Sequence, residues 1–362
     1  MSESDLPPQP PRLKSADLPD IEGTDHDFEN SVGPDHNTGV APPGWVITEP
    51  TDISTLPPSS LFDLTQPVMD ESAFFEEDTQ RPLISLLEPM TVLRTEYENG
   101  NQVFVKQIDW LIDRGWVGIR RTRGDGDCFY RSLAYAYISS LLPQSSRSQP
   151  QQQQDDTSII NVTKAISYLE STSALLESVG FQKLVFEDFL DLFVGVLKGL
   201  ISPSAGEGGR VRAKLVEEFN VAEVSNSIVM YLRLLTSAEI RSNPDNYEPF
   251  LFHPETGEQM NTRDFCEGFV EACGKEADHV QITALTKALK VDIKVAYLDG
   301  RIRSPSSSSP SSHLADVDFV EFVNDEGIEA GDKGKGKAVD GEGIILLYRP
   351  GHYDILERRL ED

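Results

Sequence analysis

The chain has 362 residues, of which 38% are hydrophobic, so it is long enough to bury a sizeable core. Its formal net charge of −28 at pH 7 excludes nucleic acid as an expected partner, because phosphate contacts need a basic face. Two interpretations of this charge stay open: attraction of a basic protein partner, or an acidic, solubilising surface. No apolar run approaches membrane-spanning length, so no membrane partner is expected either.

The first 78 residues differ in composition from the rest. They hold 17 acidic residues against two basic ones, and 12 of the 23 prolines. Such a segment cannot bury enough apolar surface to fold alone, so residues 1–78 are predicted to be a disordered acidic tail. The start, Met1 to Asp5, lacks the basic and apolar regions of a secretory signal. We expect an intracellular protein of the cytoplasm, with the nucleus as a second compartment.

Periodic apolar patterning sets in between Phe74 and Arg81, which predicts one domain over residues 79–362. Three low-complexity stretches interrupt it, near residues 144–158, 304–312 and 331–343. None of them can pack a core, so each is predicted to be a surface loop insertion.

Helical and strand periodicities both occur in this domain. Apolar residues recur at three- and four-residue intervals over 181–197 and 224–240, and a third helix is predicted from a capping box that pairs Asp278 with Gln281. Alternation predicts a strand over 291–297, and two more strands flank a Pro-Gly turn at the C-terminus. The sequence therefore predicts a mixed α and β domain that closes on a hairpin.

The segment Arg123 to Leu133 carries the most specific chemistry. Its Gly-Asp-Gly-Asp stretch makes a polar turn, and the helical spacing that follows puts Cys128 in the first turn of a helix. Unpaired backbone N–H groups and the positive end of the helix dipole stabilise a thiolate there. The same N–H groups can receive an oxyanion, since Gly126 lets the backbone approach closely.

A cysteine nucleophile needs a base, and the base needs a group that orients it. The C-terminal hairpin supplies His352 and Asp354. Residues two apart in a strand project from the same face, so Asp354 can hold one ring nitrogen of His352 while the other faces Cys128.

Each of these residues has a plainer interpretation. Cys128 can be a small buried hydrophobe, as is expected of Cys266 and Cys273, and the odd cysteine count without metal spacing is typical of a reducing compartment. The Gly-Asp stretch can be a plain turn or a fragment of a calcium loop, although it lacks the later ligands.

His-x-Asp in a strand is also commonly a surface pair. His279 competes as the base, but it follows a helix cap and has an ordinary structural explanation. The other histidines lie in the tail, in a polar stretch or in a serine-rich loop and carry no supporting pattern: His26, His36, His253 and His313.

Three ordered blocks of sequence resemble the otubains, a branch of the ovarian-tumour-type deubiquitinases. They are residues 125–131 (DGDCFYR), residues 276–285 (EADHVQITAL) and residues 346–356 (LLYRPGHYDIL). The likeness covers roughly residues 80–358 apart from the three insertions.

The resemblance implies an α+β domain of the papain-like cysteine-protease type, with a small central sheet flanked by helices. It implies hydrolysis of the amide between the ubiquitin C-terminus and a lysine, without metal or organic cofactor. Cys128 carries over as nucleophile, His352 as general base and then acid, Asp354 as the residue that orients His352, and Asp125 as the loop aspartate associated with the oxyanion hole. Ubiquitin, polyubiquitin chains and ubiquitin-conjugating enzymes are the implied partners.

The loop departs from the family pattern at two positions. Gly124 stands where proline is expected and should loosen the loop, and Asp127 stands where asparagine is expected and puts a negative charge beside the thiol. Both changes predict a free enzyme of weak activity whose site is ordered by bound ubiquitin.

Two other functions remain open from the sequence. One is a ubiquitin-binding regulator that restrains a ubiquitin-conjugating enzyme without catalysis. The other is a cysteine hydrolase that acts on another ubiquitin-like modifier or on peptides in general. The presence of Cys128, His352 and Asp354 together favours the deubiquitinase.

Overall fold

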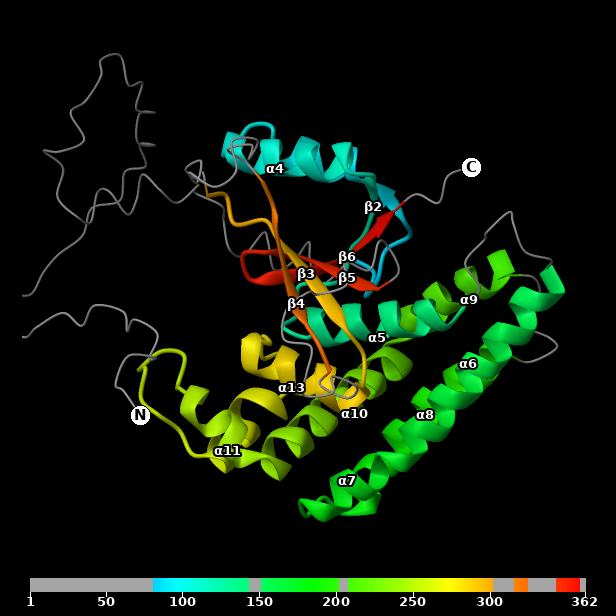
Figure 1. Ribbon diagram of the computed structural model, residues 1–362, viewed down its shortest axis with the longest axis vertical. Helices are drawn as coiled ribbons and strands as arrows, with labels where there is room; N and C mark the ends of the chain where they lie inside the picture. Colours follow the sequence, from blue (N-terminus) through cyan, green and yellow to red (C-terminus); the bar gives the residue numbers. More distant parts are fainter. Residues whose placement is uncertain (1–80, 143–150, 202–207, 302–315, 325–342, 359–362) are drawn as a thin grey trace, which may run out of the picture. The chain divides into compact units, whose positions relative to one another are not determined.

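The computed structural model describes residues 81–142, 151–201, 208–301, 316–324 and 343–358 (Figure 1). The predicted tail over residues 1–78, its boundary at residue 79, the predicted loop 304–312 and all but the last residue of the predicted loop 331–343 lie outside these residues. Side chains are described from residue 157 onward in the helix that begins at residue 151, and from residue 211 onward in the helix that begins at residue 208.

In the described residues, two short strands and two helices come first, a long run of helices follows, and four strands close the chain. The α-helices are α3 (Met90–Tyr97), α4 (Gln102–Asp113), α5 (Cys128–Leu141), α6 (Gln151–Ser171), α7 (Ser173–Ser178), α8 (Lys183–Leu200), α9 (Gly208–Asn220), α10 (Ala222–Ser242), α11 (Pro244–Tyr247), α12 (Thr262–Phe265) and α13 (His279–Leu289). A 3₁₀ turn, η2 (Glu248–Phe250), and a π-helical turn, η3 (Cys266–Val270), stand beside them. The strands are β1 (Glu88–Pro89), β2 (Trp116–Arg120), β3 (Ile293–Tyr297), β4 (Asp318–Phe322), β5 (Ile344–Arg349) and β6 (His352–Arg358).

The strands form one mixed sheet in the order β1-β2-β6-β5-β3-β4. Neighbouring strands are antiparallel except β3 and β5, which are parallel. The predicted C-terminal hairpin is confirmed: β5 and β6 pair with Arg349 opposite His352, and Gly351 makes the turn with a φ of 72°. A positive φ of this size suits glycine, which has no Cβ to clash with the backbone. The hairpin lies inside the sheet, flanked by β2 and β3.

Helices cover both faces of the sheet, as the resemblance implied. Figure 1 shows α4 on one side of the strands and α5, α10 and α13 on the other. The alternation of side chains along β5 matches these two layers: Leu346 belongs to the large core cluster with α5, whereas Ile345 and Leu347 belong to a second cluster with α3 and α4. A strand with a helix layer on each side buries both faces, which explains the continuous apolar run of β5.

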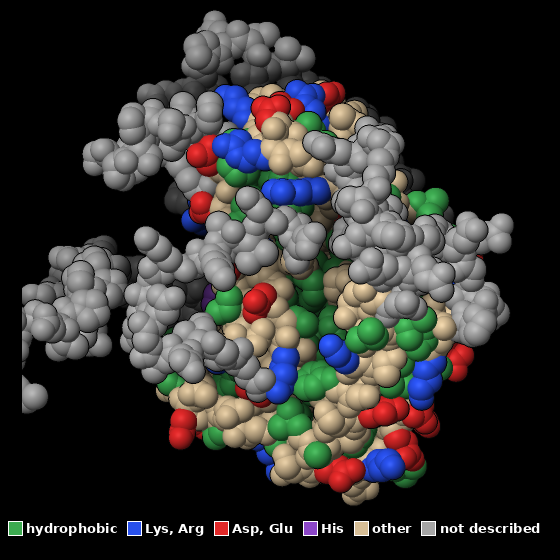
Figure 2. Space-filling view, turned by 45° about the vertical axis from the view of Figure 1, so that its right-hand side comes forward, with side chains coloured by type: hydrophobic (Ala, Val, Ile, Leu, Met, Phe, Trp, Pro, Cys, Tyr) green, Lys and Arg blue, Asp and Glu red, His purple; other side chains and the backbone are tan. Residues whose placement is uncertain are grey.

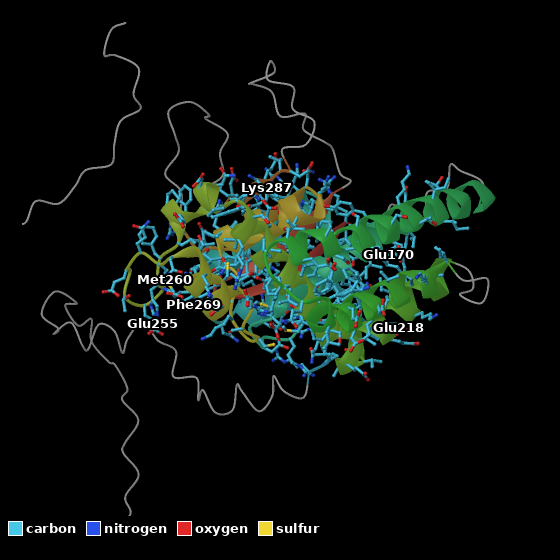
Figure 3. The ribbon with its side chains drawn as sticks, turned by 90° about the horizontal axis from the view of Figure 1, so that it is seen from below. Glu170, Glu218, Glu255, Met260, Phe269 and Lys287 are labelled. Carbon is cyan, nitrogen blue, oxygen red and sulfur yellow. The ribbon has the colours of Figure 1, made fainter. Side chains whose placement is uncertain are left out.

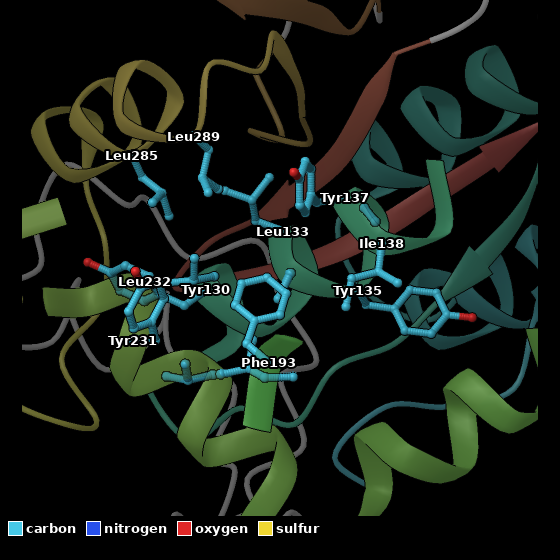
Figure 4. Packing of buried hydrophobic residues seen from close by; sticks show 14 of the residues in the cluster. Tyr130, Leu133, Tyr135, Tyr137, Ile138, Phe193, Tyr231, Leu232, Leu285 and Leu289 are labelled. Carbon is cyan, nitrogen blue, oxygen red and sulfur yellow. The ribbon is translucent and has the colours of Figure 1, made fainter. Parts of the chain in front are cut away.

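Helix α5 is the centre of the large core. Every residue from Cys128 to Ile138 is buried, so the helix has no exposed face over its first three turns. Figure 4 shows its aromatic and aliphatic side chains pointing in several directions, toward residues of α8, α10 and α13. The first residue of this helix is therefore held by packing on all sides.

A smaller apolar cluster stabilises the end of the helical layer near η3. Its buried members include Ile240, Phe265 and Val270, with Met260 and Phe269 packed against it. Figure 3 shows Met260 and Phe269 near one end of the helical layer, while Glu170 of α6 and Glu218 of α9 lie toward the other end. This cluster anchors the chain just before the segment 271–276, which reaches the active-site loop.

The three predicted helices match α8, α10 and α13, and the capping box between Asp278 and Gln281 is present at the start of α13. One expectation was wrong in part. Residues 151–158 of the predicted loop at 144–158 form the first turns of helix α6. Glutamine is a good helix former, and no glycine or proline occurs between residues 151 and 171, so a low-complexity composition did not prevent a helix here.

Basic side chains stand among acidic ones on the face drawn in Figure 2, rather than gathering into a separate area. Some basic side chains also form ion pairs with acidic ones, for example Arg94 with Asp109. Within the described residues, no helix is both long enough and apolar enough to cross a membrane.

Candidate active site

Cys128 is the first residue of α5 and is 2% exposed. The turn before it is held by Asp125, whose Oδ1 accepts hydrogen bonds from the Asp127 amide at 3.1 Å and from Arg131 Nη1 at 2.7 Å. Arg131 is fully buried one helical turn after Cys128 and also donates to Ser225 Oγ of α10. The predicted loop aspartate therefore acts as a brace that ties the turn to the helix.

His352 begins strand β6, and Asp354 follows two residues later on the same face, as predicted. His352 Nε2 and Asp354 Oδ1 are 2.9 Å apart. Cys128 acts on the same ring and helps to raise the pKa of His352, so the structure brings the three predicted side chains together across 224 positions of sequence from Cys128 to His352. With Nε2 engaged by the carboxylate, Nδ1 is the ring nitrogen left for the thiol.

Asp354 is completely buried and all its contacts are donors. Oδ1 also accepts from the Thr122 amide at 3.1 Å, and Oδ2 accepts from Arg349 Nε and Nη2 at 3.0 and 2.7 Å. Burial alone would raise the pKa of Asp354, but the Arg349 charge and the His352 hydrogen bond outweigh it and lower the pKa to about 2. The carboxylate is therefore ionised at neutral pH.

The pKa of His352 moves the other way. Burial would lower it, but the hydrogen bonds with Asp354 and Cys128 and the negative charges of both partners raise it to about 10. The imidazole is thus held as an imidazolium at neutral pH. An imidazolium beside a thiol at the start of a helix is the arrangement that favours a thiolate nucleophile.

Hydrogen bonds and a ring contact link helix α5 and Thr122 to strand β6 next to the catalytic side chains. Ser132 Oγ and Thr122 Oγ1 both donate to the Tyr353 carbonyl oxygen, at 3.1 and 2.5 Å. The Phe129 and Tyr353 rings meet edge to face with centroids 5.4 Å apart. These contacts fix the distance between the helix that carries Cys128 and the strand that carries His352.

The charge that the sequence placed beside the thiol is compensated. Asp127 Oδ1 accepts from Arg233 Nε at 2.9 Å, and Arg233 is a fully buried residue of α10. The Asp127 charge therefore does not act alone on Cys128. At Gly124, the second departure from the family pattern, the chain is anchored on both sides, because the Arg123 amide donates to the Leu83 carbonyl oxygen at 3.1 Å and Asp125 is bound by Arg131.

The other cysteines differ from each other. Cys266 is buried, as predicted, and burial raises the pKa of its thiol to about 11, so it stays protonated. The expectation of a buried residue was wrong for Cys273, which is exposed. It lies directly before Gly274, whose positive φ of 70° marks a turn in the chain after η3. All three cysteines are free.

The competing histidines have structural roles. His279 is the first residue of α13, where its amide donates to Asp278 Oδ1 at 2.7 Å and its ring packs on Phe322. His253 closes a turn by accepting from the Glu255 amide at 3.3 Å. Among the residues that the structure describes, no group of three or more His, Cys, Asp or Glu side chains is placed to hold a metal ion.

Sequence reasoning missed Arg349, Thr122 and Arg233, which contact the site without belonging to a catalytic pattern. A signal existed for Arg233, because it is the only charged residue in the otherwise apolar run from Tyr231 to Leu235. Arg349 could also have been found, since the hairpin turn places it opposite His352. Thr122 holds Asp354 through its backbone amide, which any residue type could supply, so the sequence carries no signal for this contact.

The fold and this geometry define a class of protein, the thiol-dependent hydrolases of the cysteine-peptidase type. A family profile described as "Peptidase C65 Otubain" matches residues 76–358. The chain is 36% identical over 292 residues to "OVARIAN TUMOR DOMAIN-containing deubiquitinating enzyme 1" of Arabidopsis thaliana, covering 80% of this chain and 85% of that protein. It is 30% identical over 294 residues to "Ubiquitin thioesterase OTUB1" of Homo sapiens, covering 79% of this chain and 90% of that protein.

A solved complex of ceOTUB1 with ubiquitin aldehyde and UBC13~Ub has the same fold, with a TM-score of 0.61 and 25% sequence identity; the likeness covers 80% of this chain and 99% of that one. The match of the profile alone extends over most of the chain and over every described element. The protein belongs to the otubain family, peptidase C65.

Proposed function

We propose that this otubain is a deubiquitinase that hydrolyses the isopeptide bond between the C-terminus of ubiquitin and a lysine side chain, with Cys128 as nucleophile. The observation that carries the assignment is the contact of a buried thiol at a helix start with an imidazole whose other nitrogen is held by Asp354. The relatives named as ubiquitin thioesterases or deubiquitinating enzymes support the substrate class.

The reaction follows from the protonation states. The Cys128 thiolate attacks the carbonyl carbon, and the backbone N–H groups of the first turn of α5 receive the oxyanion. The His352 imidazolium then gives its proton to the lysine amine as the C–N bond breaks, which leaves a thioester between ubiquitin and Cys128. Water attacks this thioester with neutral His352 as base, and the thiol and the free ubiquitin carboxylate are released.

The same imidazole can serve as acid and then as base because its environment changes during the cycle. In the free enzyme the Coulomb interaction with Cys128 is one of the causes that raise the pKa of His352. This cause disappears when the sulfur becomes a neutral thioester. The pKa of His352 falls at the stage in which the ring must accept a proton from water, while Asp354 continues to hold Nε2.

A panel of linkage-defined diubiquitins tests the proposal. Wild-type protein is expected to convert at least one linkage to monoubiquitin, and Cys128→Ala is expected to leave every linkage intact. Cys266→Ala is the matched control, because it removes a thiol that is also buried but remains protonated and lies in the separate cluster near η3. Cleavage by Cys128→Ala, or no cleavage by the wild type, would contradict the proposal.

Binding of a ubiquitin-conjugating enzyme is a second function that a specific observation favours. Structural relatives have been solved as complexes with UBC13~Ub and with UBCH5B~Ub, at TM-scores of 0.59 to 0.61. We expect Cys128→Ala to slow ubiquitin-chain synthesis by such an enzyme as well as the wild type does. If ubiquitin-chain synthesis is equally fast in the presence and in the absence of Cys128→Ala, this second function is contradicted.

The compartment belongs to the same proposal. The cysteines are free, and Cys273 is exposed without a disulfide partner. A free, exposed thiol is typical of a reducing compartment, so we place the protein in the cytoplasm with access to the nucleus. Fractionation of cells that express the tagged protein checks this, and recovery from the secreted fraction would contradict it.

A further inference from the structure

Arg233 joins the active-site loop to a second segment of the chain. It is fully buried in α10 and donates to the Gly126 carbonyl oxygen at 3.1 Å and to Asp127 Oδ1 at 2.9 Å. The same guanidinium donates to the carbonyl oxygens of Val270 and Lys275, at 2.9 and 2.7 Å. One side chain thus holds the turn before Cys128 and the segment after η3 in a fixed relation.

The surroundings of Arg233 stabilise its positive charge through an aromatic ring and a carboxylate. Its guanidinium carbon lies 4.3 Å from the centroid of the Tyr130 ring, a cation–π contact that packs the group against α5. A fully buried arginine is costly unless a carboxylate and hydrogen bonds satisfy it, and Asp127 supplies the carboxylate. The position of Asp127 is therefore coupled to that of Arg233.

Asp127 stands at the N-cap position of α5 and makes no side-chain capping hydrogen bond. An aspartate at this position ordinarily accepts from the second or third amide of the helix. Here Oδ1 points away, toward Arg233 and the Gly274 amide, which donates at 3.1 Å. The first amides of α5, beside Cys128, are left without this carboxylate, and they are the groups assigned to the oxyanion.

The two loops also touch backbone to backbone. A Cβ on Gly126 would lie 2.1 Å from the Gly274 carbonyl oxygen, so the turn before Cys128 has no room to move toward the segment that follows η3. Both glycines have positive φ, 77° and 70°. The contact therefore joins the two backbones next to the place where Asp127 meets Arg233 and the Gly274 amide.

We propose that Arg233 is a positioning residue that keeps the Asp127 carboxylate out of the oxyanion hole. This inference rests on the proposed function, because the oxyanion arises only if Cys128 attacks a carbonyl group. Without Arg233, Asp127 turns back to cap α5, occupies the amides that the tetrahedral intermediate needs and leaves an unpaired negative charge beside the thiolate. The aspartate that departs from the family pattern is harmless only while Arg233 holds it.

The test is a pair of variants with opposite expected effects. Arg233→Gln is expected to lower kcat for a fluorogenic ubiquitin substrate about 100-fold, the size of a lost oxyanion donor, while KM changes less than about threefold. Adding Asp127→Ala is expected to recover about tenfold of that loss, because alanine cannot occupy the amides. A double variant as slow as Arg233→Gln, or slower, overturns the proposal, since a merely structural role predicts no recovery.

Alkylation of Cys128 by iodoacetamide, followed by peptide mass spectrometry, reads the electrostatics without ubiquitin. Its pH midpoint is expected to rise in Arg233→Gln and to return toward the wild-type value when Asp127→Ala is added. An unchanged midpoint in Arg233→Gln overturns the coupling of the two residues. If the wild type cleaves no ubiquitin substrate while the midpoints shift as expected, the proposed function fails and the pairing of Arg233 with Asp127 stands.

Two further variants separate position from folding. Arg120→Gln is the matched control, because Arg120 is also buried and also pairs with a carboxylate, that of Glu357, away from the loop. It is expected to lower the Tm with kcat unchanged. Arg233→Lys keeps the positive charge but loses the planar guanidinium. It is expected to lower kcat about tenfold and to leave the alkylation midpoint unchanged. Wild-type kcat in this variant would overturn the proposal, and this test holds even where Arg233→Gln fails to fold.

Discussion

The two halves of the candidate site are built in different ways. The hairpin β5–β6 supplies His352, its partner Asp354 and the stabilising Arg349 within six consecutive residues. The nucleophile loop before Cys128 takes its supports from Arg233 of α10 and from Gly274, more than 100 positions away. Apart from the Thr122 amide, the hairpin therefore supplies its own geometry. The loop is braced nearby by Asp125 and Arg131 but also depends on contacts from distant parts of the chain.

This difference separates two kinds of sensitivity. A change in the hairpin removes a charge or a hydrogen bond and acts on the protonation of His352. It therefore shifts the pH dependence of the rate as well as lowering kcat. A change in the loop moves the backbone next to the oxyanion, so it lowers kcat without moving the pKa of His352. Three substitutions test this separation.

Asp354→Asn should have the largest effect. Loss of the carboxylate removes a cause that raises the pKa of His352, so that pKa falls from about 10, and the imidazolium form is lost at lower pH. We expect kcat to fall about 10³- to 10⁴-fold, as in triads that lose the orienting carboxylate.

The alkaline limb of kcat/KM should move down by about one unit or more in the same variant. A pH–rate profile of the purified protein checks both expectations. Asp109→Asn is the control, because it removes a carboxylate from the half-exposed pair with Arg94. A limb that stays in place in Asp354→Asn would show that this carboxylate does not set the charge of His352.

Gly126→Ala should come next, with about a 100-fold loss of kcat, the size expected when an oxyanion donor is displaced. The new Cβ would lie 2.1 Å from the Gly274 carbonyl oxygen, so the loop must shift. Gly257→Ala is a close control: its φ of 69° resembles the 77° of Gly126, and no atom lies within 4 Å of its added Cβ.

The positive φ alone costs about 1–2 kcal/mol for alanine, so both variants should lose stability and only Gly126→Ala should lose activity. Thermal unfolding and turnover of a ubiquitin substrate are measured together. Equal loss of kcat in the two variants would mean that backbone strain, and not the contact with Gly274, accounts for the effect.

Arg349→Gln should have the smallest effect, about tenfold on kcat/KM at neutral pH. Asp354 would lose two of its four hydrogen bonds but keep those from His352 and from the Thr122 amide. The pKa of Asp354 would rise from about 2 because its main opposing charge is gone. Activity should therefore be lost at a higher pH on the acidic side, and a profile identical to the wild type would contradict this role.

The same division explains what the sequence could predict. The helix start at Cys128 and the shared strand face of His352 and Asp354 follow from local rules: a polar turn before a helical pattern, and a two-residue repeat in a strand. The capping box at Asp278 was likewise local. These features need only neighbours in sequence, so they were legible without coordinates. The resemblance to the otubains, and not these rules, singled the three residues out as catalytic.

Other features depend on which segments meet in space. The pairing of Asp127 with Arg233 requires α10 to pack against the loop before Cys128. The exposure of Cys273 depends on a turn that follows the π-helical segment η3. Low-complexity composition also misled, since residues 151–158 continue into a packed helix. From the sequence alone the Asp127 charge was predicted to be uncompensated, because its partner Arg233 lies 106 positions away.

The central claim is that Cys128, and not another thiol, attacks the C-terminal carbonyl of ubiquitin. A ubiquitin probe with an electrophilic C-terminus, followed by intact mass and peptide mapping, tests it most directly, because Cys273 is more exposed and offers an internal competitor. The account predicts one adduct on Cys128, its loss in Cys128→Ala and its retention in Cys273→Ser. An adduct on Cys273, or capture that persists in Cys128→Ala, would contradict it.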